Sequence, residues 1–328
     1  MRIAMNKNGR KPDPALLAGL GRFLALALLM GVMAVVSKVF MSAQNLRNII
    51  TNASIMIILG VGQTVTIITN GPDLSVGSIM TICSVVAALM VKVMGVFFPV
   101  AILAALALGM ALGYLNGFMI AKVGIPSFIS TYGLQWAVFG FAYVILRGYV
   151  IYDFDPGFRF IGNGYLFGVI PMPIVVMIVV VSAGMFLMNR TTLGRRLFVV
   201  GANRDAARMS GVRVDNTIIW AFVISGFLAA LAGVVLVARI NAVQADIGAA
   251  YLLPTIATVF MGGTSPTGGQ GTIIGTVIGA LIMTVVNNGM NLMAVPSEWR
   301  DAIIGVLIIL TVLLDLQMRK RLAKAGLR

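Results

Sequence analysis

The segment TNGPDLSVGS, residues 69–78, places one carboxylate and several small polar side chains between two long apolar stretches. Asp73, Asn70, Ser75 and Ser78 offer hydrogen-bond acceptors and donors in a region that otherwise has few. Amides and hydroxyls, with almost no ionisable groups among the apolar stretches, suit a neutral polar solute better than an ion or a proton relay. The segment therefore predicts contact with a small, polyhydroxylated solute.

Asp73 also has a purely structural interpretation. Pro72 stops the preceding helix because it has no N–H group and a fixed φ. An aspartate at the N-cap of a helix that begins at Leu74 accepts hydrogen bonds from free backbone N–H groups and complements the helix dipole. The two interpretations are compatible, and the residue pattern leaves both open.

A second glycine-rich break, GGTSPTGGQG, occupies residues 262–271. Irregular backbone inside a membrane is tolerated only where protein or a water-filled cavity satisfies its polar groups. Both breaks are therefore candidates for lining a pathway, and ordinary turns at the cytoplasmic face are the alternative. An aromatic ring could stack on a sugar, although packing or interfacial anchoring is the commoner role. The further candidate path residues are Thr264, Ser265, Asn287, Asn288, Tyr132 and Trp136.

The residue types argue against an enzyme. The chain has no histidine, and its only cysteine, Cys83, lies in an apolar run. A thiolate zinc site, a disulfide framework and a Cys–His nucleophile are therefore excluded. No nucleophile–base pair emerges among the remaining polar residues. We expect no catalytic residue, no metal and no cofactor in this chain.

The composition is that of a polytopic membrane protein. Of 328 residues, 59% are hydrophobic and only 10% are charged, whereas a soluble domain carries about 25% charged residues. The net charge of +14 comes from cations at the N-terminus, in a central loop and in the C-terminal tail. Short basic segments beside apolar spans follow the positive-inside rule, so no nucleic-acid partner is expected.

Hydropathy predicts an all-α bundle of about ten spans, near residues 18–38, 49–69, 75–94, 97–121, 125–146, 171–188, 218–238, 251–263, 272–293 and 301–317. An even number of spans, eight or ten, places both basic ends and the arginine-rich loop in the cytoplasm. The first apolar run is long, so we expect a retained helix and not a cleaved signal peptide. The whole chain, 1–328, is one transmembrane domain, with cytoplasmic segments 1–17, 189–217 and 318–328.

Glycine spacing predicts close helix packing. Gly109, Gly113 and Gly117 are four residues apart, as are Gly271, Gly275 and Gly279. Such stripes lay a groove along one face of a helix, where a neighbouring backbone approaches closely.

The loop 191–217 predicts a short helix. Asn203 is a candidate N-cap, Asp205 lies in the first turn, Arg208 lies near the end, and Gly211 terminates the helix. A two-turn helix is marginal in isolation, so docking on a soluble partner through Ala206, Ala207 and Met209 is expected. The alternative is a basic loop that lies on anionic membrane lipid.

Four motifs resemble the permeases of ribose/xylose/arabinose-type bacterial ABC importers. They are DLSVGS at 73–78, GANRDAARMSGV at 201–212, GGTSPTGGQGTIIGTVIGALIM at 262–283 and NNGMNLM at 287–293. The chain departs from the family pattern at Asn70, Gly71 and Pro72, and at Pro266, where the family commonly has glycines or aliphatic residues. The departures leave open whether a pentose, a hexose, a polyol or another small polar solute is carried.

The resemblance implies a permease of the bacterial inner membrane. Two permease chains pair with ATPase subunits, which bind ATP and magnesium, and a periplasmic binding protein delivers the sugar. The resemblance assigns the family's coupling helix to Gly201, Asn203, Asp205, Ala206, Ala207, Arg208, Ser210 and Gly211. The runner-up hypothesis is a secondary transporter or facilitator of a neutral polar solute that works alone.

Overall fold

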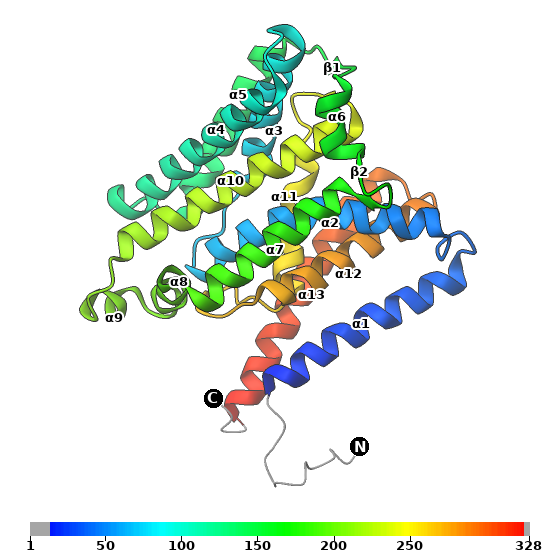
Figure 1. The fold of residues 1–328 in the computed structure, drawn as a ribbon. Helices are drawn as coiled ribbons and strands as arrows, with labels where there is room; N and C mark the ends of the chain where they lie inside the picture. The colour runs from blue at the N-terminus through cyan, green and yellow to red at the C-terminus, as the bar shows by residue number, and fades with distance from the viewer. Residues whose placement is uncertain (1–13, 325–328) are drawn as a thin grey trace.

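The computed structural model describes residues 14–324 and is almost entirely helical (Figure 1). Within these residues, eight helical stretches are long and apolar enough to cross a membrane. They are built from α1 (Pro14–Val36), α2 (Ala43–Ile68), α3 (Val76–Ala88) with η1 (Leu89–Val93), α4 (Phe98–Phe118) with η2 (Met119–Val123), α5 (Ser127–Leu146), α7 (Met172–Arg190), α10 (Val214–Ile240) and α12 (Ile273–Leu292). The expected all-α membrane fold is confirmed.

The other two predicted spans also correspond to helices. The predicted span at 251–263 is α11 (Leu252–Met261), a short apolar helix preceded by η3 (Ala249–Tyr251). The last predicted span falls within α13 (Ser297–Lys324). The N-terminal cations at residues 2–11 and the end of the basic tail, residues 325–328, lie outside the described residues.

The small amount of sheet in residues 14–324 is formed by short strands between α5 and α7 and by one strand after α10. Strand β1 (Ile151–Tyr152) pairs with β4 (Ala242–Val243), and β2 (Tyr165–Leu166) pairs with β3 (Ile170–Pro171). The short helix α6 (Pro156–Asn163) lies between them in the chain, with Asp155 as its N-cap. These elements lie at the opposite end of the bundle from α8 (Thr192–Ala202) and α9 (Arg204–Met209) (Figure 1).

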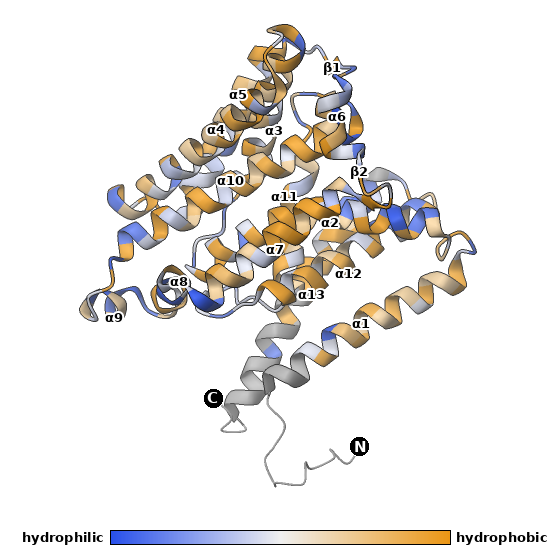
Figure 2. Ribbon diagram, viewed as in Figure 1, coloured by the Kyte–Doolittle hydropathy of each residue, from blue (hydrophilic) through white to orange (hydrophobic). Residues whose placement is uncertain are grey.

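The core is formed around α2 and α10, which are mostly buried, whereas α1, α4 and α7 leave many apolar side chains exposed. Apolar residues cover the long helices, and hydrophilic residues gather at the helix ends and in the loops (Figure 2). An apolar exterior of this kind suits contact with lipid hydrocarbon.

Both glycine stripes bring backbones into contact, as the sequence predicts. A Cβ atom at Gly113 would overlap the carbonyl oxygen of Phe222 in α10, and one at Gly117 would lie 2.7 Å from Ile219 Cα. In α12, added Cβ atoms at Gly275 and Gly279 would overlap carbonyl oxygens at the end of α11. Glycine is therefore required at these positions for α4–α10 and α11–α12 packing.

A third interruption, between α10 and α11, was not predicted. The segment from Asn241 to Gly248 turns back into the bundle, where Gly248 N–H donates to Thr81 Oγ1 at 2.9 Å. Gly248 also packs directly against the backbone of Gly77 near the start of α3. Two interrupted segments of the chain thus meet inside the protein, at α3 and ahead of α11.

Candidate transport site and coupling segment

Asp73 is the centre of a buried polar network. Its Oδ1 atom accepts hydrogen bonds from Ser75 N–H at 2.9 Å and from Ser75 Oγ at 2.6 Å, and its Oδ2 atom accepts one from Ser225 Oγ at 2.8 Å. All three residues are buried. Every hydrogen bond donates toward the carboxylate, which is the arrangement that an acceptor-only, ionised aspartate needs.

The network extends to three further helices. Asn116 of α4 donates to Ser75 Oγ at 2.8 Å, and Ser130 of α5 donates to Asn116 Oδ1 at 3.1 Å. With its amide oriented to satisfy both groups, Gln63 of α2 bonds the backbone N–H and C=O of Asp73, both at 3.2 Å. The loop between α2 and α3 is therefore hydrogen-bonded to α2, α4 and α10, and through Asn116 to α5.

The N-cap of α3 differs from the one expected from the sequence. Helix α3 begins at Val76 with Ser75 as its N-cap residue, not at Leu74 after Asp73. The Asp73 carboxylate nevertheless accepts a backbone N–H, that of Ser75, two residues along the chain. This is the local turn that aspartate side chains commonly form. Ser78 is also buried, and its hydroxyl donates to Ser75 C=O at 2.9 Å.

The ten candidate path residues do not form one site. Thr264 and Ser265 are buried beside the second break, and Thr264 Oγ1 finds no hydrogen-bond partner among the described residues. Asn288 exchanges two hydrogen bonds with Asn45 at the start of α2, while Asn287 is half-buried on the same helix, α12. Tyr132 and Trp136 are exposed on α5 and lie edge to face, at 6.2 Å between ring centroids.

Asn70 is exposed and lines a cavity of about 550 Å³ together with Ser127, α9 and the start of α10. Its φ of 59° places it in the left-handed region, which asparagine tolerates better than most residues. The cavity also holds charges of both signs, from Arg204, Arg208, Asp205 and Asp215. Burial lowers the pKa of the Arg204 guanidinium, and nearby Arg208 lowers it further.

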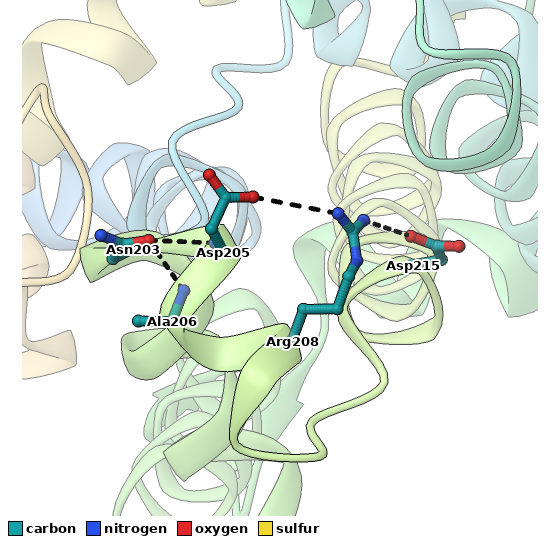
Figure 3. Close-up of polar contacts among 5 residues, drawn as sticks. All are labelled: Asn203, Asp205, Ala206, Arg208 and Asp215. Carbon is teal, nitrogen blue, oxygen red and sulfur yellow. Dashed lines mark hydrogen bonds and ion pairs between the residues drawn. The ribbon is translucent and has the colours of Figure 1, made fainter.

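The short helix predicted in the loop exists as α9. Asn203 is its N-cap, and its side-chain oxygen accepts from Asp205 N–H at 2.9 Å and from Ala206 N–H at 3.0 Å (Figure 3). Ser210 donates to Ala206 C=O, and Gly211 follows with φ of 78°. The prediction of the cap and of the glycine terminus is confirmed.

Ion pairs attach α9 to α10. Arg208 reaches Asp205 at 4.0 Å and Asp215 at 3.4 Å (Figure 3). Lys122 reaches the other oxygen of Asp215 at 3.1 Å. These side chains are partly exposed, so each pair contributes only about 0–1 kcal/mol. The Arg208–Asp215 pair links α9 to the start of α10, and the Lys122–Asp215 pair links that start to η2.

The predicted docking face needs one correction. Ala207 does not face outward: it is completely buried in a small cluster with Val200, Val214 and Phe222, among others. Met209 is 91% exposed, and Ala206 is exposed beside it. The outward surface of α9 therefore consists of Ala206 and Met209 flanked by charged side chains.

Several residues that join these sites are not among the path and coupling residues named from the sequence. Gln63 and Asn116 are polar residues within long apolar helices, and that contrast marks them as candidates. Ser225 and Ser130 give no such signal, because serines inside membrane helices commonly bond their own helix backbone. Arg204 and Asp215 likewise look like ordinary members of a charged loop.

Residues 14–324 form an almost entirely helical bundle with interrupted segments and a docked loop helix, which is the architecture of a polytopic membrane protein. The family model described as "Branched-chain amino acid transport system / permease component" matches residues 45–312. The chain belongs to this family and is a multi-pass inner-membrane permease component, not an enzyme.

Curated relatives match over most of the chain. The ribose import permease protein of Escherichia coli K12 is 38% identical over 300 residues, which cover 89% of this chain and 92% of that protein. The Bacillus subtilis ribose import permease protein is 36% identical, over 90% of this chain and 92% of its own. The autoinducer 2 import system permease protein of Photorhabdus luminescens is 30% identical, over 92% and 90%. No solved structure matches the chain significantly.

Proposed function

We propose that this chain is the permease subunit of an ABC importer that carries ribose or a similar monosaccharide across the bacterial inner membrane. The observation that carries the proposal is the 38% identity with a ribose import permease along 89% of the chain. The family description and the relatives name different solutes, so family membership alone does not select one. The relatives named for ribose have the higher identities of those described above, which favours a ribose-like sugar.

A cytoplasmic ATPase binds α9 in this proposal and supplies ATP and magnesium chemistry that this chain lacks. The support is the exposed Met209 on a helix whose opposite side is anchored by buried Ala207. A protruding apolar side chain ringed by charges suits a groove on a soluble partner. A periplasmic binding protein delivers the sugar, and a second copy of the permease completes the channel.

The orientation places α8, α9 and both chain ends in the cytoplasm. The described start of α1 and the end of α13 lie toward the same end of the bundle as α8 and α9, and β1 and α6 lie at the other end (Figure 1). The central basic loop fits the cytoplasmic side under the positive-inside rule.

Asp73, Ser75 and Ser78 belong to the closed part of the solute path, and Asn70 to its open cytoplasmic side. The support is the contrast between buried Asp73 and exposed Asn70, only three residues apart. Opening the path separates the helices that the Asp73 network holds together. Tyr132 and Trp136 present aromatic surface to the sugar, while Thr264, Ser265, Asn287 and Asn288 act from the second break and α12.

Co-purification tests the assignment. The tagged chain, extracted gently from its native membrane, is expected to retain a stoichiometric partner with a P-loop, identified by mass spectrometry. Arg208→Glu is expected to lose that partner, because the new carboxylate faces Asp205 and Asp215 and opposes the dipole at the end of α9. Arg196→Glu, on the exposed surface of α8, is the matched control and keeps the partner.

Two results would contradict the proposal. A chain that purifies alone and still carries ribose in liposomes is a self-sufficient facilitator. A chain whose partner remains bound in Arg208→Glu, with normal uptake, does not use α9 for coupling.

A further inference from the structure

The two chain breaks, at residues 69–78 and 262–271, and the coupling segment, residues 201–211, meet at one backbone carbonyl group, that of Ile68. Ile68 is the last residue of α2, where carbonyl groups lose their partners within the helix. Gly269, in the second break, donates its N–H to this carbonyl at 2.9 Å. The first break begins at the next residue, Thr69, so the two breaks are joined directly by this hydrogen bond.

Gly201, at the end of α8, packs closely against the same carbonyl group from another direction. Gly201 is buried, and a Cβ atom at its position would overlap the Ile68 oxygen and lie 2.7 Å from Gly269 N. Real Cβ atoms essentially never approach a backbone atom this closely. Only glycine therefore permits this meeting of three segments.

Two neighbouring contacts reinforce the junction. Arg204, the first residue of α9, donates to Thr69 C=O at 3.2 Å. Gly268 and Gly269 have φ of 78° and 71°, which turns the second break so that its backbone lies against Asn70 and Ala202. The coupling segment thus contacts two consecutive carbonyls, the last of α2 and the first of the first break, and the backbone of the second break.

We propose that Gly201 is a positioning residue through which movement of α9 reaches both breaks at the Ile68 carbonyl. The contacts among Gly201, Ile68 and Gly269 are backbone to backbone, and such close packing transmits movement. Gly201 then serves transport without touching the ATPase. The inference rests on the proposed function for the source of the movement.

Gly201→Ala tests this in the assembled complex with its ATPase and binding protein, reconstituted in vesicles. The measurements are ATPase retention, ATP hydrolysis and ribose uptake. We expect retention and hydrolysis to persist while uptake per ATP falls about tenfold, within the range of typical coupling between sites. Gly31→Ala is the control, because a Cβ atom at Gly31 in α1 meets nothing within 4 Å.

Arg204→Gln gives a second test that adds no atom to the crowded junction. It replaces the guanidinium that bonds Thr69, and we expect a smaller loss of uptake per ATP with the partner still bound. An unchanged ratio in both variants would overturn the inference, as would loss of the ATPase from Gly201→Ala, which would place Gly201 in the docking surface. Failure of the wild-type chain to bind an ATPase would instead contradict the proposed function.

Discussion

At the scale of single residues, the buried carboxylate of Asp73 offers a direct test of the polar network around it. Asp73→Asn replaces an acceptor-only carboxylate with an amide whose NH₂ group must face Ser75 or Ser225, both of which now donate to it. We expect a loss of about 1–3 kcal/mol of stability, the cost of leaving a buried polar group poorly paired. Thermal unfolding in detergent measures this loss, and vesicle uptake measures the accompanying loss of transport.

Asp153→Asn is the matched control, because the Asp153 side chain is 73% exposed and pairs only with partly exposed Lys92. Its effect on unfolding is expected to be small. If Asp73→Asn retained wild-type stability and uptake, the charge would matter neither for the network nor for the path.

Residue-scale prediction succeeded where the determinants were local. Asn203 caps the start of α9 and Gly211 follows its end, and both act through contacts within a few residues. Their identity and spacing were therefore sufficient to predict where the helix begins and ends. The distant partners of Asp73 come from α2 and α10, and nothing in the pattern of serines distinguishes Ser225. Ala207 was misjudged because which side of a two-turn helix faces inward depends on the packing of α10.

At the scale of elements, the α4–α10 contact depends on glycine. In Gly113→Ala the added methyl group would overlap Phe222 C=O, so α4 and α10 must move apart. We expect destabilisation of about 1–3 kcal/mol, typical of overpacking. Limited proteolysis and thermal unfolding would measure it. Gly140→Ala on α5, where a Cβ atom meets nothing within 4 Å, should be neutral or slightly stabilising.

Hydropathy located the helices well because each long helix must satisfy its own backbone within the membrane. Hydropathy missed the segment between α10 and α11, where the chain turns back into the bundle before Gly248 packs on Gly77. The residues there are mostly small and apolar, so composition does not separate a re-entrant segment from a helix end. Their conformation is fixed by contact with α3.

At the scale of the whole molecule, the side of the membrane on which each end of the bundle lies can be tested directly. Met209 in α9 is 91% exposed, and Phe167, in the turn between β2 and β3, is 89% exposed, whereas Cys83 is buried. In a Cys83→Ala background, a membrane-impermeant thiol reagent is expected to label Phe167→Cys in spheroplasts, in which the outer membrane has been breached. Met209→Cys should be labelled only after the inner membrane is opened, because the proposed orientation has the arginine-rich loop in the cytoplasm. Labelling of Met209→Cys before that step would mean that the orientation is the opposite of the one proposed. The ATPase docking surface would then lie on the side of the membrane where ATP is not available.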